Sequence, residues 1–258
     1  MPAESSARPR VSALILARDE ADNLPGCLAS LDWCDERIVV VDAASRDATE
    51  ALARRLADRV VVRVFDDFAS QRNAALADSS GDWVFAVDAD ERSSRAQGDE
   101  IREAIGGDAH AGFRVPIASV VLGRAFRFSG TQHDRPLRLF RRGLGRWIGA
   151  VHETVDLDGE VDDLRHALTH RTIPDMTTFL AKIERYTTLE AHKLAGEGVR
   201  PRLGDLTARP IWTFAKLYLG KQGFRDGLEG LMFCALSGVS AAVRSWKLRE
   251  IARAGGSS

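Results

Sequence analysis

The chain has 258 residues, of which 45% are hydrophobic, and this is enough for one sizeable core or for a core with a small appendage. Its three cysteines are an odd number without C-x-x-C spacing, which disfavours a disulfide framework or a zinc site and is typical of a reducing cytosol. The formal net charge is only −1, but residues 200–258 carry +6 while the rest of the chain carries −7.

The first 88 residues alternate between apolar runs and helical patterns. Three stretches with apolar residues at helical spacing lie between the runs, and the third of them contains Gln71, Arg72 and Asn73. Repetition of this unit predicts an α/β fold, with a mostly parallel central sheet and helices on both faces. The runs that predict buried strands are 11–17, 37–43, 60–65 and 83–88.

The pattern changes after Arg92. A helix is expected near 99–105, and shorter, half-polar strands are typical of an antiparallel or edge arrangement. From Asp175 onward the spacing predicts helices. These later strands are expected at 112–122, 125–130 and 137–142, and the helices at about 175–196, 205–222 and 226–252.

The basic C-terminal part contains an uncharged apolar stretch, residues 231–243. Its 13 residues are fewer than the roughly 18–20 needed to span a bilayer. Two interpretations stay open: a helix packed on the core, or a basic, amphipathic contact with an anionic membrane surface. The polar N-terminal segment 1–10 lacks the apolar core of a signal peptide, and it is expected to be disordered, as is the tail 255–258.

Acidic residues follow three of the predicted strands. Asp19 and Glu20 follow the first strand, Asp42 ends the second, and Asp88 and Asp90 follow the fourth. Ligands of an open parallel sheet bind beyond the carboxyl ends of its strands, so these acids are expected at one edge. Converging carboxylates repel one another unless a cation or ligand donors compensate them. Because Mg²⁺ or Mn²⁺ uses one or two carboxylates together with phosphate oxygens and water, the pattern predicts a phosphate-bearing ligand.

Rival motifs are absent from the sequence. It contains no G-x-G-x-x-G after the first strand, no G-x-x-x-x-G-K-[ST] loop and no G-x-S-x-G, which disfavours dinucleotide-binding, P-loop and serine-nucleophile sites. An acid after a strand is often only the N-cap of the next helix, and this alternative applies to Asp19 and Asp47.

Arginines are concentrated in residues 124–146, where seven of them accompany a single acid, Asp134. Such a run forms either a solvated basic face or a groove for an anionic acceptor, since arginine binds phosphate in bidentate fashion. Trp147 and Phe140 lie among these arginines and suit either sugar stacking or the core. Four histidines have no metal-ligand spacing with a cysteine and are interpreted as structural: His110, His166, His170 and His192.

Several of these segments together resemble a known family. The stretches are VSALILARDEADNLPGCLASLDWCDERIVVVDAASRDAT, ASQRNAALADSSGDWVFAVDADE, LRLFRR, VHE at 151–153 and the pattern R-P-x-W-x-F-x-K-x-Y at 209–218. In this order they resemble the inverting family 2 glycosyltransferases, which have the GT-A fold, and more closely the subgroup that includes lipopolysaccharide-core glucosyltransferases. The resemblance covers about residues 11–250.

The resemblance implies a UDP-sugar donor, a divalent cation and a cell-envelope glycan acceptor such as the lipopolysaccharide inner core. Glu153 would be the base that activates the acceptor hydroxyl, and Asp88 with Asp90 would hold Mg²⁺ or Mn²⁺, with Asp90 the more direct ligand. The donor site would be formed by Glu20, Asp42, Gln71, Arg72, Asn73 and Asp88. Acceptor contacts are assigned to Arg138, Arg141 and His152.

The same resemblance implies a division of the chain. Residues 11–173 would form the catalytic domain, with a nucleotide-sugar half at 11–92 and an acceptor half at 93–173. Residues 174–254 would form a helical extension. The enzyme would be cytoplasmic, with the inner face of the cytoplasmic membrane as a peripheral partner and no nucleic acid.

Five positions in three motifs depart from the family pattern. Arg18 and Asp19 replace the usual L-N, Ala44 and Arg46 replace glycine and threonine, and Arg72 replaces lysine. These changes affect donor identity more than reaction class. The alternatives are a glycosyltransferase with a peptide or other acceptor, and a non-catalytic relative that binds a nucleotide sugar.

Overall fold

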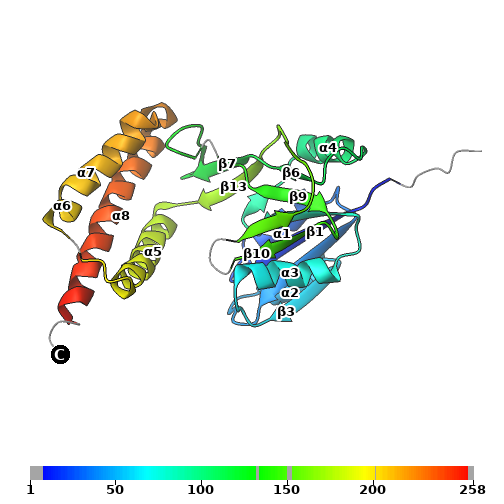
Figure 1. Cartoon of the computed structure of the whole chain (residues 1–258), viewed down its shortest axis with the longest axis horizontal. Coiled ribbons are helices and arrows are strands. Elements are labelled where there is room, and N and C mark those ends of the chain that lie inside the picture. The colour runs from blue at the N-terminus through cyan, green and yellow to red at the C-terminus, as the bar shows by residue number, and fades with distance from the viewer. Residues whose placement is uncertain (1–7, 132–133, 150–152, 201, 255–258) are drawn as a thin grey trace, which may run out of the picture. The chain divides into compact units, whose positions relative to one another are not determined.

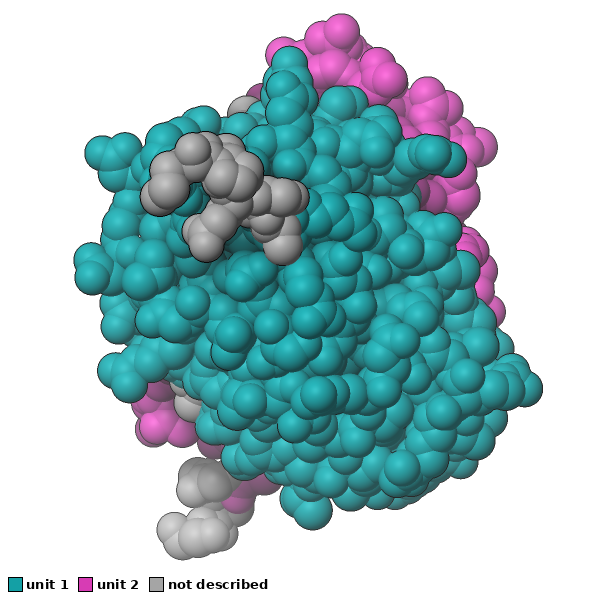
Figure 2. Space-filling view, turned by 90° about the vertical axis from the view of Figure 1, so that its right-hand side faces the viewer, with its two compact units in different colours: residues 1–117, 134–170 teal, residues 118–133, 171–258 magenta. Residues whose placement is uncertain are grey.

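The structure is a computed structural model that describes residues 8–131, 134–149, 153–200 and 202–254. Seven residues of the N-terminal segment, the tail 255–258 and His152 therefore lie outside the described residues. The chain forms two compact units, which Figure 2 colours separately. Unit 1 comprises residues 1–117 and 134–170, and unit 2 comprises residues 118–133 and 171–258.

Unit 1 contains the predicted alternation of strands and helices (Figure 1). Strands β7 (Ile117–Val121) and β13 (Leu168–Ile173) run through the boundaries between the units. The other elements of unit 1 are β1 (Val11–Ala17), α1 (Leu24–Ser30), β2 (Glu36–Asp42), α2 (Thr49–Leu56), β3 (Arg59–Arg63), α3 (Phe68–Asp78), β4 (Trp83–Asp88), β5 (Glu91–Arg92), α4 (Arg95–Ala104), β6 (Gly112–Arg114), β9 (Leu137–Arg141), β10 (Gly145–Ile148), β11 (Thr154–Leu157) and β12 (Val161–Asp163).

The central sheet of unit 1 has seven strands among the described residues, in the order β12-β6-β9-β4-β1-β2-β3. β1 pairs in parallel with both β2 and β4, and β2 pairs in parallel with β3. β9 alone inserts antiparallel between β4 and β6. The predicted α/β class with a mostly parallel sheet is confirmed.

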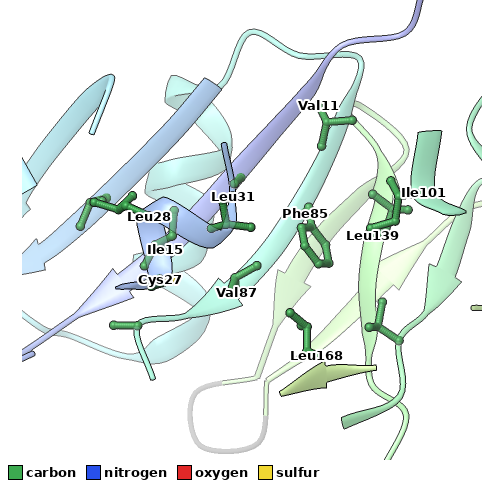
Figure 3. Close-up of a cluster of buried hydrophobic side chains, with 14 of the residues drawn as sticks. Val11, Ile15, Cys27, Leu28, Leu31, Phe85, Val87, Ile101, Leu139 and Leu168 are labelled. Carbon is green, nitrogen blue, oxygen red and sulfur yellow. The ribbon is translucent and has the colours of Figure 1, made fainter. Parts of the chain in front are cut away.

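The two faces of the sheet are packed by different helices, as side-chain alternation along β1 shows. Val11, Ala13 and Ile15 join a cluster with α1, α2 and α4, whereas Leu14 joins a cluster with α3 and Trp147. Figure 3 shows the first cluster, in which Leu28, Phe85, Ile101 and other labelled side chains gather on one face. Such burial is worth about 25 cal/mol per Å² of apolar surface, and it fixes the strand ends that carry the acids.

The order of the strands places the acids together. The chain passes from β1 outward to β2 and β3, and then returns to β4 on the other side of β1. A change of direction of this kind leaves a crevice at the carboxyl ends of the inner strands, where open α/β sheets bind ligands. Asp88 ends β4 and Asp42 ends β2, so both point to this edge.

The segment 112–122 differs from the single strand that was predicted. It forms β6 and β7, which are separated at Pro116 because proline lacks the N–H that a strand needs. The predicted strand 125–130 is reduced to β8 (Arg124–Ala125), which pairs with β7.

Unit 2 contains the C-terminal helices and the hairpin of β7 and β8. Its helices are α5 (Met176–Gly196), α6 (Leu203–Leu206), α7 (Ala208–Ala215), a π-helical turn η1 (Lys216–Gly220), a 3₁₀ turn η2 (Gly223–Asp226) and α8 (Gly227–Ala254).

One buried acid attaches residues 118–133 to these helices. Asp226 accepts hydrogen bonds from the backbone N–H groups of Arg127 and Phe128, at 3.0 and 3.2 Å, and from the Ser129 hydroxyl at 2.7 Å. Phe126 and Phe179 add an apolar cluster in the same unit. Residues 118–133 therefore belong with the helices and not with the acceptor half of the predicted domain.

Helix α8 is longer than its uncharged stretch indicated. Of the helices that the structure describes, the continuous segment Gly223–Ala254 is long and apolar enough to cross a membrane, with a mean hydropathy of 1.3 in its 18-residue window. The expectation that this region is too short to span is thus wrong by length and composition. The core helix of a soluble protein meets the same two criteria, and 28% of the window is buried.

Candidate active site

Asp88, the last residue of β4, is held by two arginines. Nη2 of Arg72 donates to Oδ1 at 2.7 Å, and Nη2 of Arg138 donates to Oδ2 at 2.9 Å. Arg72 comes from α3, and Arg138 comes from β9, the strand that pairs with β4. The Asp88 carboxylate therefore connects α3 to β9. Burial raises the pKa of Asp88, but the two guanidinium groups outweigh burial and hold the pKa well below its usual range.

Glu91 contacts both Asp88 and Arg138, and its side chain is fully buried. Its carboxylate accepts from the backbone N–H of Asp88 at 2.8 Å and from Nη2 of Arg138 at 3.0 Å. Burial raises the pKa of Glu91 to about 7, against the opposing effect of Arg138. The pKa of Arg138 is lowered by burial and raised more strongly by Asp88 and Glu91, so the guanidinium keeps its charge.

Asp90 contacts His170, which lies 80 residues further along the chain. Nε2 of His170 is 3.1 Å from Oδ2 of Asp90, and both side chains are partly buried. β13 brings the histidine there, because it pairs with β5 and sets His170 opposite Glu91. Burial lowers the pKa of His170, but the hydrogen bond to Asp90 and the nearby carboxylates raise it above the ordinary value.

Glu153 lies directly before β11 and lines the same cavity as Asp88. Its Oε1 is 3.4 Å from Nε of Arg72, so one arginine contacts both Asp88 and Glu153. The two acids line a cavity of about 480 Å³. The predicted base and the first acid of the D-x-D motif therefore share one wall, as the sequence led us to expect.

The acids of β1 and β2 occupy the next part of the edge. Asp42 is buried, accepts from the backbone N–H of Ala44 at 2.9 Å and lies 3.1 Å from Nη1 of Arg18. The backbone N–H of Glu20 donates to Thr49 at 2.7 Å, and its carboxylate accepts from Asn23 at 2.8 Å. Both acids thus lie at the carboxyl ends of neighbouring strands, although their contact with a nucleotide stays a prediction.

The other two members of the helix motif make structural contacts. Gln71 is buried and donates to the carbonyl oxygen of Val64 at 3.0 Å. Asn73 donates to the carbonyl oxygen of Trp147 at 2.8 Å and accepts from its N–H at 3.0 Å. These bonds fasten α3 to the loop before it and to β10, so both residues position Arg72.

Arg141 lies apart from the other candidates. It pairs with Trp83 at the amino end of β4, and its guanidinium stacks over the Trp83 ring at 4.8 Å and bonds Asp108 at 2.9 Å. Arg138 lies three residues earlier on the same strand, and an odd spacing puts the two side chains on opposite faces. The structure therefore removes Arg141 from the acceptor contacts, while His152 lies outside the described residues.

Sequence reasoning missed three residues of this region. His170 was interpreted as structural, because no local spacing links it to Asp90. Glu91 follows the D-x-D motif but carried no separate signal. Arg114, at the end of β6, lines the cavity together with Arg138. Only the pairing of distant strands reveals these contacts.

The side chains of Asp90 and His170 suit a divalent ion that phosphate oxygens of a substrate also bind. Among the described residues, no group of three or more His, Cys, Asp or Glu side chains is placed to hold a metal. Asp90 and His170 supply two adjacent donors, whereas both oxygens of Asp88 are already bonded by arginines. Two protein ligands fit Mg²⁺ or Mn²⁺, because these ions commonly complete their shell with phosphate oxygens and water.

The sequence is similar to known proteins over most of its length. The family model described as "Glycosyl transferase family 2" matches residues 12–148. The chain is 32% identical over 249 residues to the lipopolysaccharide core biosynthesis glycosyltransferase LpsC of Rhizobium meliloti (strain 1021), with 93% of this chain and 92% of the relative covered. It is 23% identical over 254 residues to an uncharacterized glycosyltransferase of Rickettsia conorii, covering 93% and 90% of the two chains.

Two solved structures are similar in outline. The mannosyltransferase PcManGT from Pyrobaculum calidifontis, in complex with GDP-Man and Mn²⁺, has 18% identity and a TM-score of 0.49, and covers 97% of this chain and 81% of that one. The S. aureus TarS 1–349 structure with UDP-GlcNAc has 13% identity and a TM-score of 0.46, and covers 95% and 92%.

Proposed function

The chain belongs to glycosyltransferase family 2, and from this premise we propose that it transfers a sugar, with inversion, from a UDP-sugar to a hydroxyl of a cell-envelope glycan such as the lipopolysaccharide core. We propose glucose as that sugar. One observation carries the proposal: Arg72 contacts Asp88 of the D-x-D motif and Glu153, so both halves of a transfer site meet at one sheet edge.

The donor is proposed to lie over the ends of β1, β2 and β4. Asp42 and Glu20 face the nucleoside, and the diphosphate lies toward Asp90 and His170. Arg72 and Arg138 stay bound to Asp88 and add positive charge beside the diphosphate. A bound Mg²⁺ or Mn²⁺ would be held by Asp90 and His170 and would neutralise charge on the leaving diphosphate.

Glu153 is proposed as the general base. Inversion is a single in-line displacement, so the acceptor hydroxyl must lose its proton on the side opposite the leaving group. Glu153 lines the cavity beside Asp88 and is partly buried, which lets its carboxylate reach a hydroxyl that enters from solvent. Arg72 orients this carboxylate through its Nε atom.

The enzyme is proposed to act in the cytoplasm, at the inner face of the membrane. In unit 2, α7 and η1 expose Ile211, Trp212 and Leu219, at 70%, 67% and 64% of their full accessible surface. Arg209 and Lys216 are also exposed, and residues 206–225 contain no acid, although Arg209 pairs with Asp205 at 3.4 Å. Apolar and aromatic side chains flanked by cations match an anionic lipid surface in both polarity and charge.

Donor hydrolysis tests the proposed reaction. The purified chain is incubated with UDP-sugars, and then with GDP- and dTDP-sugars, with and without Mn²⁺, and free nucleotide is measured. We expect slow, metal-dependent release from one donor. Asp90→Ala should abolish this release, because half of the proposed metal site is lost, while the fold persists.

Asp99→Ala is the matched control, since Asp99 is an exposed acid on α4 outside the site. Glu153→Gln should block transfer to a lipopolysaccharide-core extract by about 100-fold or more, as loss of a general base does. Normal turnover by a folded Asp90→Ala protein would refute the assignment. Binding of a nucleotide sugar without any release or transfer would instead favour a non-catalytic relative.

A further inference from the structure

The cavity beside Glu153 extends away from the proposed donor. It is lined by strand residues of β4, β6 and β9 and by the segment 153–155, together with Arg72 and Trp147. Strand order places β9 and then β6 on the side of β4 that is opposite to β1 and β2. The ends of β6 and β4 are two strand spacings apart, about 10 Å. This separation leaves room for a sugar ring between Asp88 and Arg114, so the far end of the cavity lies on the acceptor side.

The cavity wall contains more positive than negative groups. Its ionisable residues are three arginines and two acids: Arg72, Arg114, Arg138, Asp88 and Glu153. Asp88 binds two of the arginines, and Glu153 contacts Arg72 more loosely at 3.4 Å. Arg114 has no hydrogen bond or ion pair through its guanidinium to any residue in the described part of the chain, and its side chain is exposed.

Two buried donor atoms in the same wall also have no partner. Nη1 of Arg72 and Nε of Arg138 are buried and lack a hydrogen-bond acceptor among the described residues. Arg72 as a whole is only 5% exposed. An unpaired buried donor is costly, so a ligand that supplies acceptor oxygens is favoured at this wall.

We propose that this cavity binds an oxyanion of the acceptor, a phosphate or a carboxylate, and that Arg114 is the residue that holds it. The guanidinium fork of Arg114 matches two oxygens of such a group. The anion fixes the acceptor at one end of the cavity, and its hydroxyl is presented to Glu153 at the other. This inference rests on the proposed function, because it assigns the acceptor side from the placement of the donor.

The assignment also separates Arg114 from the arginine run 124–146. Of that run, Arg138 lines the cavity, whereas Arg141 bonds Asp108 and Arg142 donates to the carbonyl oxygen of Gly81 at 2.7 Å. Acceptor selection by charge is therefore expected to depend on one arginine outside the run.

Calorimetric titration of the full chain, saturated with UDP and Mn²⁺, tests the proposal. The probes are glucose 6-phosphate, glucuronate and neutral glucose. We expect one or both anionic sugars to bind more tightly than glucose, and their ratio shows whether phosphate or carboxylate is preferred. Arg114→Gln should weaken the preferred anion about tenfold or more, as expected for a lost charge-assisted hydrogen bond. Arg114→Lys, which keeps the charge without the fork, should give an intermediate loss.

Arg55→Gln is the control, because Arg55 is an exposed arginine on α2 away from the cavity. UDP binding in each preparation reports whether the variant is folded. If UDP fails to bind the wild type, the proposed function itself is wrong. If UDP binds but the anionic sugars bind no better than glucose, or if Arg55→Gln weakens them as much as Arg114→Gln does, the proposal for Arg114 is overturned.

Discussion

Arg138 determines the charge state of the D-x-D region. Its guanidinium bridges Asp88 and Glu91 through one nitrogen, at 2.9 and 3.0 Å. A charge inside a protein is tolerated when it is paired, and removal of one partner leaves the other without compensation. Asp88 retains Arg72, whereas Glu91 forms no ion pair with a second arginine in the part of the chain that the structure describes. Glu91 is therefore the group that depends on Arg138.

Arg138→Met is expected to destabilise the protein by about 3 kcal/mol, because buried Glu91 loses its counter-charge and must either stay charged without a partner or take up a proton. The loss is measured as a shift in the free energy of unfolding in urea at pH 7.5. A double variant, Arg138→Met with Glu91→Gln, removes both charges and should recover most of that loss. Equal destabilisation of the single and double variants would contradict the dependence of Glu91 on Arg138.

For single residues, the sequence predicted which side chains come together where they lie at a strand end or within a motif. Asp88, Arg72 and Glu153 do meet, as the order of motifs indicated. The contact between His170 and Asp90 was not predictable, because it depends on the register of β13 against β5. Arg141 was misplaced because residue type and neighbourhood do not reveal which face of a strand a side chain takes.

Helix α4 fixes the turn that precedes β13. The Glu100 carboxylate accepts from the backbone N–H groups of Arg165 and His166, at 2.9 and 2.8 Å. The side chains of both residues also contact it, at 3.1 and 2.9 Å. Burial raises the pKa of Glu100, but these donors outweigh burial and lower the pKa to about 2. Through this turn, α4 sets the start of the strand that carries His170.

Glu100→Gln is expected to cost about 2 kcal/mol at pH 7, a value reduced from the full pKa shift because Arg165 and His166 are exposed. The folded pKa is depressed, so the contribution of Glu100 is present above its ordinary pKa of 4.5 and is lost as pH falls toward about 2. The difference between wild type and variant should therefore shrink over this window.

Urea unfolding at pH 7, 5, 4 and 3 measures this effect, with Glu103→Gln, an exposed acid on the same helix, as the control. A difference that stays constant with pH, or that Glu103→Gln reproduces, would be incompatible with a charge-dependent bond to the turn.

Elements were predictable where the local pattern is strong. The strands 11–17 and 83–88 appear with the predicted bounds, because long apolar runs buried on both faces leave little alternative. β10 to β12 have three or four residues each and mixed burial, so no periodicity marks them. Their pairing depends on distant strands, which a single sequence does not reveal.

At the scale of the whole molecule, net positive charge occurs together with an exposed apolar face in the C-terminal part of the chain. Residues 200–258 carry +6, and the exposed apolar face of α7 and η1 lies within them. The chain has no comparable basic stretch in its first 90 residues, where acids surround the proposed donor site. This division suits an enzyme that binds a soluble nucleotide sugar with one unit and an anionic lipid surface with the other.

Co-sedimentation with vesicles tests the lipid contact. The full chain should bind vesicles that contain phosphatidylglycerol and should bind phosphatidylcholine vesicles weakly, and the difference should fall at high salt. Trp212→Ser with Leu219→Ser should reduce binding about tenfold or more, because each exposed side chain contributes about 1 kcal/mol or more when buried in the interface. Lys216→Glu should weaken binding to the anionic vesicles in particular.

Val64→Ser is the matched control, since Val64 is an apolar residue of unit 1 that is 76% exposed. Val64→Ser is expected to leave vesicle binding unchanged. The loss of binding in the double variant then follows from the position of Trp212 and Leu219 and not from a general decrease in exposed apolar surface. The same face would also suit a second copy of the chain, so oligomeric state is measured by light scattering. A dimer that Trp212→Ser with Leu219→Ser dissociates, without any vesicle binding by the wild type, would show a protein interface and reject the membrane contact. Monomeric protein that binds anionic vesicles through this face would place transfer at the membrane surface.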